Sequence, residues 1–199
     1  MLADSFRHNF SGLFRFSGRS SPRLFWPYAI VMTAILFVAM PLMMQWFMAP
    51  FFRSAGKILA DHPDLARSGD AIAYSDISEE VALPANFFVD LVTAVASMVG
   101  IYIALISASV VRRLHDGGRS AIWGMVPLVL LVFGLAGMRY LFAGIGTGAD
   151  LHPGVFALMF CNNVVYLASL AVLFFQLVRI SDPHDNHYGR APDAERELP

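Results

Sequence analysis

The stretch RRLHDGGRS, residues 112 to 120, interrupts an otherwise apolar part of the chain. The sequence before it ends in SASVV, residues 107 to 111, and the sequence after it begins AIWGMVPLVLLVFG, residues 121 to 134. Gly117 and Gly118 follow several ionisable side chains, and glycine permits the φ > 0 geometry that a tight reversal needs. The stretch therefore predicts a short polar turn between two apolar helices, the second and third of four.

The apolar segments around this turn are long enough to cross a membrane. Charged residues make up only 15% of the 199-residue chain, whereas a soluble domain carries roughly 25%. A helix needs about 20 mostly apolar residues to span the hydrocarbon core. Four segments reach that length, namely 24–52, 87–111, 121–145 and 155–178. The sequence thus predicts an all-α, polytopic membrane protein built as a bundle of four transmembrane helices.

The polar segments differ in charge, and this difference predicts the orientation of the chain. A transmembrane domain over 24–178 is expected between an aromatic and basic lead-in, 1–23, and a polar tail, 179–199. Arginines gather in the lead-in, the turn and the tail, while the loop 53–85 is mostly acidic. Basic segments favour the cytoplasmic side. We therefore expect a multi-pass membrane protein with both termini in the cytoplasm and the acidic loop outside.

Two features are expected at membrane depth. Asp90 lies about one turn into the second helix, and Arg139 lies near the end of the antiparallel third helix. Both are near the outer boundary, so we expect a structural Asp90–Arg139 pair rather than a transport or proton-relay site. A stripe of small residues also suits close packing in the bundle or in a homo-oligomer. The stripe consists of Ala96, Gly100, Ala104 and Ala108.

Three short motifs fall on the predicted cytoplasmic face: FSGR (16–19), RRLHDGGRS (112–120) and DNHYGRAP (185–192). With the four helices, they make the chain resemble the bacterial inner-membrane family called domain of unknown function 805, the YhaH-like proteins. That family's most specific signature, R-R-[LA]-H-D-x-[GD]-x-S, matches RRLHDGGRS in full. Its closing pattern, G-x-N-x-[YF]-G-x-x-P, is matched more loosely, since the first glycine is absent. The resemblance implies four helices and a place in a bacterial inner (plasma) membrane, and it brings no established activity.

Two interpretations of the charged motifs stay open. In the first, they form a structural clasp in which Asp116 and His115 join the turn to Arg19 or to the tail around Asn186. In the second, the arginines bind an anionic lipid headgroup or a phosphate-bearing small molecule through forked hydrogen bonds. The candidate residues are Arg19, Arg112, Arg113, His115, Asp116, Arg119, Asn186 and Tyr188.

Other classes of function are less favoured by the sequence. The adjacent His115 and Asp116 are typical of some metal sites, but such sites need further ligands at suitable spacing, so a metal-dependent membrane enzyme is a lesser alternative. A small transporter is another. We predict no catalytic residue, bound metal or cofactor, and no nucleic-acid partner. The expected partners are the lipid bilayer, in particular anionic phospholipid at the cytoplasmic face, and a second copy through the small-residue stripe.

Overall fold

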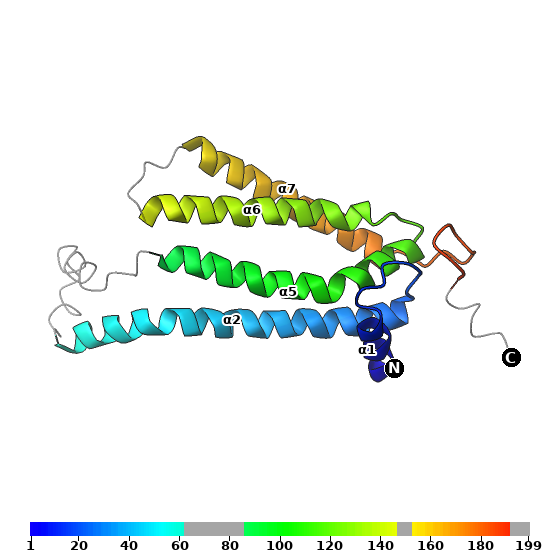
Figure 1. Cartoon of the computed structure of the whole chain (residues 1–199), viewed down its shortest axis with the longest axis horizontal. Helices are drawn as coiled ribbons and strands as arrows, with labels where there is room; N and C mark the ends of the chain where they lie inside the picture. Colours follow the sequence, from blue (N-terminus) through cyan, green and yellow to red (C-terminus); the bar gives the residue numbers. More distant parts are fainter. Residues whose placement is uncertain (62–85, 147–152, 192–199) are drawn as a thin grey trace.

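The computed structural model describes residues 1–61, 86–146 and 153–191, and these residues form five α-helices (Figure 1). In chain order the helices are α1 (Leu2–Ser11), α2 (Pro22–Asp61), α5 (Phe87–Asp116), α6 (Ile122–Gly146) and α7 (Pro153–Val178). All but α1 are long and apolar enough to cross a membrane. The predicted all-α architecture with four candidate spans is confirmed, and it is typical of a multi-pass membrane protein.

Two helices end later than the sequence predicted. Helix α2 continues to Asp61 instead of ending at residue 52, so part of the expected acidic loop is helical and the rest, 62–85, lies outside the described residues. Helix α5 continues to Asp116 instead of ending at residue 111. Both corrections have one cause: polar residues end an apolar span, but they do not break the backbone hydrogen bonds of a helix.

The charged residues 112–116 therefore form the last turn of α5 rather than a loop. The reversal begins at the glycines that follow, where Gly118 takes a positive φ of 69°, a conformation that suits glycine. The amide of Gly117 donates to the carbonyl of Leu114 at 3.1 Å, and the amide of Arg119 donates to the same carbonyl at 2.8 Å. The glycines end the helix, and the side chains before them keep helical spacing.

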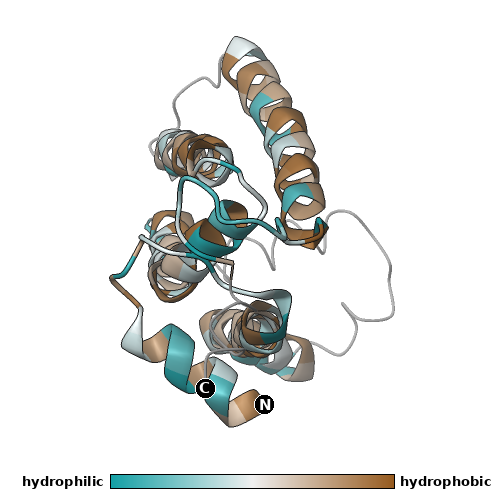
Figure 2. Ribbon diagram, turned by 90° about the vertical axis from the view of Figure 1, so that its right-hand side faces the viewer, coloured by the Kyte–Doolittle hydropathy of each residue, from teal (hydrophilic) through white to brown (hydrophobic). Residues whose placement is uncertain are grey.

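The four long helices run side by side, with α5 between α2 and α6, and α7 packed against α6 (Figure 1). The short α1 lies across the beginning of α2. Figure 2 looks toward this end of the bundle, where hydrophilic residues gather in α1 and in the segments over the helix ends. We call it the cluster end, because the charged residues 112–116 at the end of α5 lie there. Most of the buried core also lies here, in a group formed by Phe25, Tyr28, Ala29, Met32, Ile106, Leu114 and Leu177.

The lead-in is held to α2 by polar and aromatic contacts. Ser5 and Asn9 are one helical turn apart on α1 and are both buried. The Ser5 hydroxyl and the Asn9 amide donate to the carbonyl of Leu24, the latter at 2.9 Å. The Phe6 and Phe10 rings lie 5.3 and 5.9 Å from the Tyr28 ring. Part of the expected lead-in is thus a helix docked on the bundle.

The residues of the small-residue stripe differ in how deeply they are buried. Ala108 is buried, with 1% of its surface exposed, whereas Gly100 and Ala104 are exposed on the same helix. A Cβ added at Gly100 would meet no atom within 4 Å. The stripe therefore supports packing inside the chain at one end only, and its role between copies stays a prediction.

Replacing Tyr28 by Phe is expected to lower the stability of the bundle. Tyr28 is fully buried, and its hydroxyl donates to the carbonyl of Leu105 on α5 at 2.7 Å. Losing this bond costs about 1 kcal/mol. Tyr28→Phe should therefore lower the midpoint of thermal unfolding in detergent, while the matched change at the exposed Tyr140 should not. Equal midpoints for the two variants would contradict the assignment.

Candidate functional site

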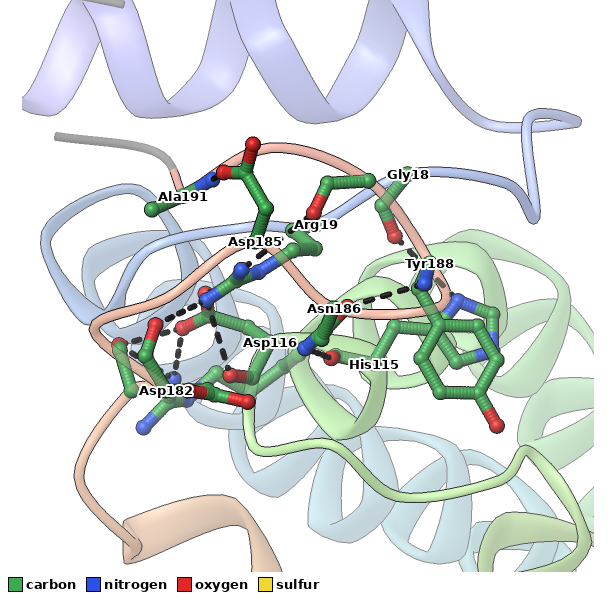
Figure 3. A network of polar contacts seen from close by, with 12 residues as sticks. Gly18, Arg19, His115, Asp116, Asp182, Asp185, Asn186, Tyr188 and Ala191 are labelled. Carbon is green, nitrogen blue, oxygen red and sulfur yellow. Dashed lines mark hydrogen bonds and ion pairs between the residues drawn. The ribbon is translucent and has the colours of Figure 1, made fainter. Parts of the chain in front are cut away.

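The carboxylate of Asp116 lies at the centre of a polar cluster at the cluster end (Figure 3). Asp116 has no exposed surface. Its Oδ1 accepts a hydrogen bond from Arg19 Nε at 3.1 Å, and its Oδ2 accepts from an Nη atom of Arg113 and from the Ser181 hydroxyl. These donors come from the segment before α2, from α5 and from the tail after α7. One carboxylate thus joins three segments that are distant in sequence.

Arg19 connects the segment before α2 to the tail. Its side chain is 2% exposed. Besides the carboxylate, it donates to the main-chain carbonyls of Asp182 and of His184, the latter at 2.8 Å. The amide of Asp182 donates in turn to the carbonyl of Asp116 at 2.9 Å. The guanidinium of Arg19 is therefore surrounded by acceptors from the protein.

Arg113 binds the C-terminal end of α7. Its Nε donates to the carbonyl of Leu177 at 3.0 Å, and an Nη atom donates to the carbonyl of Arg179. The last carbonyls of a helix have no partner inside the helix and carry a partial negative charge. The buried guanidinium of Arg113 satisfies these carbonyls and neutralises Asp116 at the same time. Its position fixes the end of α7 against the end of α5.

Arg112 points the other way, toward the lead-in. Its side chain is buried, and it forms no ion pair with a carboxylate of the described residues. Its Nη atoms donate to the carbonyls of Gly12 and Arg15, both at 2.6 Å, and to Asn9 Oδ1 at 3.0 Å. A Cβ at Gly12 would lie 2.8 Å from this guanidinium. Only glycine lets the chain after α1 pass so close.

The positive charge of Arg112 also acts on His8 in α1. Burial lowers the pKa of His8 below its ordinary value, and the nearby charges of Arg112 and Arg15 lower it further. His8 is therefore expected to be neutral near pH 7. A neutral imidazole adds no further positive charge to a region where Arg112 has only carbonyl and amide oxygens as acceptors.

His115 and the tail form the outer layer of the polar cluster. The His115 and Tyr188 rings stack with centroids 3.9 Å apart and planes 4° apart (Figure 3). The Asn186 amide donates to the carbonyl of His115 at 3.1 Å, and His115 Nδ1 lies 3.3 Å from the carbonyl of Gly18. Asn186 and Gly189 exchange two backbone hydrogen bonds that close a tight turn. The motif around residues 185–191 thus places an amide and an aromatic ring on the end of α5.

Most of the candidate residues meet in this cluster, and Arg119 does not. Arg119 is half-buried after the reversal, and its guanidinium forms no hydrogen bond or ion pair with the described part of the chain. Sequence reasoning missed Asn9, Gly12, Ser181 and Asp182. Each is a single residue in a polar segment, so neither spacing nor charge distinguished it from its neighbours.

The predicted Asp90–Arg139 ion pair is absent from the described residues and needs correction. Arg139 instead donates to the Thr93 hydroxyl at 2.6 Å. Thr93 lies three residues after Asp90 on the same face of α5, and Asp90 is exposed in the first turn of the helix. A carboxylate at that position interacts favourably with the positive end of the helix dipole without a basic partner.

The family model described as "Protein of unknown function (DUF805)" matches residues 13–190. The chain belongs to this family. The DUF805 match covers FSGR and RRLHDGGRS in full and DNHYGRAP as far as Arg190, and it confirms the resemblance predicted from these motifs. No curated protein and no solved structure matches the chain.

The positions of the His, Cys, Asp and Glu side chains show whether they could bind a metal ion together. Within residues 1–61, 86–146 and 153–191, no group of three or more His, Cys, Asp or Glu side chains is placed to hold a metal ion. The Asp116 carboxylate next to His115 is occupied by two guanidinium groups and a hydroxyl. In this DUF805 protein the adjacent His and Asp therefore serve as hydrogen-bonding groups within the polar cluster.

Asp116→Asn should destabilise the protein strongly. The change leaves two buried guanidinium groups without a counter-charge, and breaking a buried pair in this way costs about 3–5 kcal/mol. The measurement is thermal unfolding of the full chain in detergent. Asp185→Asn is the matched control, because Asp185 is exposed and its Oδ1 accepts only from the amide of Ala191 at 2.9 Å. If both variants unfold at the wild-type temperature, the central role of Asp116 is wrong.

Proposed function

We propose that this protein is a multi-pass inner-membrane protein in which the polar cluster acts as a structural clasp at the cytoplasmic face. One observation carries the proposal: both oxygens of the buried Asp116 carboxylate accept hydrogen bonds, and the donors come from three separate segments. A carboxylate held in this way is well suited to fix segments relative to one another. It is poorly suited to acid–base chemistry, because both of its oxygens already accept hydrogen bonds from the protein.

The hydrogen bonds that the arginines donate to the protein favour the clasp over the anion site. Arg19, Arg112 and Arg113 all donate to carbonyls or side chains of the protein, and each side chain is almost fully buried. An anion at these groups would have to displace those acceptors, which would then lose their partners. Arg119 alone of the four predicted arginines keeps its guanidinium apart from the described acceptors. An anionic ligand is thus a better candidate at the edge of the cluster than at its centre.

The clasp has a clear mechanical role in this bundle. Helices α2 and α7 flank α5 and α6 but contact each other little. The clasp joins the beginning of α2 to the end of α7 through the last turn of α5. It can therefore set the separation of two helices that do not pack together along their length.

The proposed orientation in the membrane rests on the positive charges at the cluster end. The cluster end carries the arginines of the lead-in, of residues 112–119 and of the tail as far as Arg190. Positively charged segments next to spans favour the cytoplasm. We therefore infer that the polar cluster and both terminal segments face the cytoplasm, and that the far end of α2 faces outward.

A double-mutant cycle tests the clasp. Arg19→Ala and Asp116→Ala both remove the ion pair between these two residues, so the double variant should lose less stability than the sum of the two single variants. The coupling should reach the range of about 0.5–3 kcal/mol expected for residues in one network. Thermal unfolding in detergent gives the comparison, and Arg7→Ala with Asp185→Ala, both exposed and apart, should be additive.

Two results would contradict the clasp. Additive effects of Arg19→Ala and Asp116→Ala would show that the two residues act independently. A rise in the unfolding temperature of the wild type with inorganic phosphate, absent from an Arg112→Ala variant, would favour the anion site instead.

Cysteine labelling tests the orientation. Cys161 is first changed to Ser, and single cysteines are then placed at Asp185 in the tail and at Lys57 near the far end of α2. In spheroplasts of a bacterial host, a membrane-impermeant maleimide should label position 57, and it should label position 185 only after lysis. The opposite pattern would reverse the proposed orientation.

A further inference from the structure

A large apolar cavity lies beside the polar cluster, inside the bundle. Its volume is about 1150 Å³, and its walls come from all four long helices. This exceeds the roughly 300–1,000 Å³ of common small-molecule sites. Trp26 and Phe37 on α2 and Leu170 and Phe174 on α7 are among the lining residues, and His115 lies at the cluster end.

The cavity is elongated along the helices. On α2 its lining residues run from Phe25 to Phe37, and on α5 they run from Val99 to His115. At 1.5 Å per residue these stretches are about 18 and 24 Å long. Half of the hydrocarbon core measures about 15 Å. The cavity therefore extends over about one leaflet, beginning at the cluster end, which fits an extended hydrocarbon chain.

The walls offer few polar groups to a ligand. The Thr33 hydroxyl and the Tyr102 hydroxyl lie 2.9 Å apart and bind each other, and His115 Nδ1 faces the carbonyl of Gly18. A polar metabolite would lose its hydration here without gaining enough hydrogen bonds. A hydrocarbon chain would lose nothing and would fill space that otherwise lacks dispersion contacts.

The cavity is bordered by two helices that scarcely touch. Near the cluster end the Trp26 and Phe174 rings bring α2 and α7 together, with centroids 6.1 Å apart. Elsewhere α2 and α7 contact each other little, and lining residues such as Ile30 and Phe37 remain exposed. Because both helices are candidate spans, a chain entering between them would come from the bilayer.

Two basic side chains belong to the cluster end, where the cavity begins: Arg23 in the first turn of α2 and Arg119 after the end of α5. On α2, positions 26, 30, 33 and 37 line the cavity, and the same 3–4 spacing places Arg23 on this face one turn beyond Trp26. Arg23 is exposed. Arg119 lies two residues before Ala121, which also lines the cavity. Neither guanidinium has a hydrogen bond or ion pair with the described residues, so both can meet an anionic headgroup.

We propose that the cavity holds one acyl chain of an anionic phospholipid and that Arg23 and Arg119 bind its phosphate. This inference rests on the membrane placement proposed above, but it concerns a different set of residues from the clasp. The apolar walls select a hydrocarbon chain, the length of the cavity selects one leaflet, and the two guanidinium groups select a negatively charged headgroup.

Native mass spectrometry of the full chain tests the proposal. The protein is reconstituted in vesicles of equal parts phosphatidylglycerol and phosphatidylcholine and then released in detergent. Wild type should retain one phosphatidylglycerol. Ala34→Trp places an indole in the cavity that Ala34 lines and should abolish retention. Ile35→Trp is the matched control, because the adjacent Ile35 is exposed but does not line the cavity.

A second pair of variants tests the headgroup. Arg23→Gln with Arg119→Gln should remove the preference for phosphatidylglycerol over phosphatidylcholine, while Arg7→Gln, on the exposed surface of α1, should keep it. This pair also decides the matter if Ala34→Trp does not fold, as judged by its circular dichroism.

Several outcomes would overturn the lipid site. They are equal retention by Ala34→Trp and Ile35→Trp when both are folded, equal retention of the two phospholipids by wild type, and an unchanged preference in the double arginine variant. Failure of the clasp is distinguished from these results, since it is measured in lipid-free detergent with Asp116 variants.

Discussion

The burial of the Asp116 carboxylate is the constraint on which the cluster end depends. Moving charges out of water is costly, and an ion pair repays this cost only when its remaining donors and acceptors are also bonded. Here the guanidinium groups of Arg19 and Arg113 meet that requirement by binding the ends of neighbouring segments as well as the carboxylate. The geometry of the helix ends therefore follows from the hydrogen-bonding needs of three charged side chains.

The polar contacts at the cluster end also determine which of the apolar helices lie next to one another. Hydrocarbon surroundings give apolar helices little reason to prefer one another over lipid. Specific polar contacts at one end can supply the missing preference. In this bundle they bring α2 and α7 to the same end of α5, while the space between the two helices remains open to an apolar occupant.

The sequence predicted the spans well and the polar end only in part. Long apolar runs are a strong signal because the hydrocarbon core sets a minimum length. The charges of the residues from Arg112 to Asp116 single them out, but the same charges predict an exposed turn, because polar side chains are usually exposed. In the structure they are helical and buried, since their partners come from segments that only the fold brings near. Asn9 and Ser181 escape prediction for the same reason, and the partner that Arg139 has in the structure, Thr93, is an uncharged residue that a search for opposite charges does not find.

The order of the clasp residues along the chain has a consequence for synthesis. Arg19 and Arg113 are made before the segment from Leu177 to His184, whose backbone carbonyls accept hydrogen bonds from their guanidinium groups. Chains fold progressively from the N-terminus as they are made. Until the last span has been inserted, the two guanidinium groups lack these acceptors and must stay hydrated. Closure of the cluster end is thus a late event that reports completed insertion of all four spans.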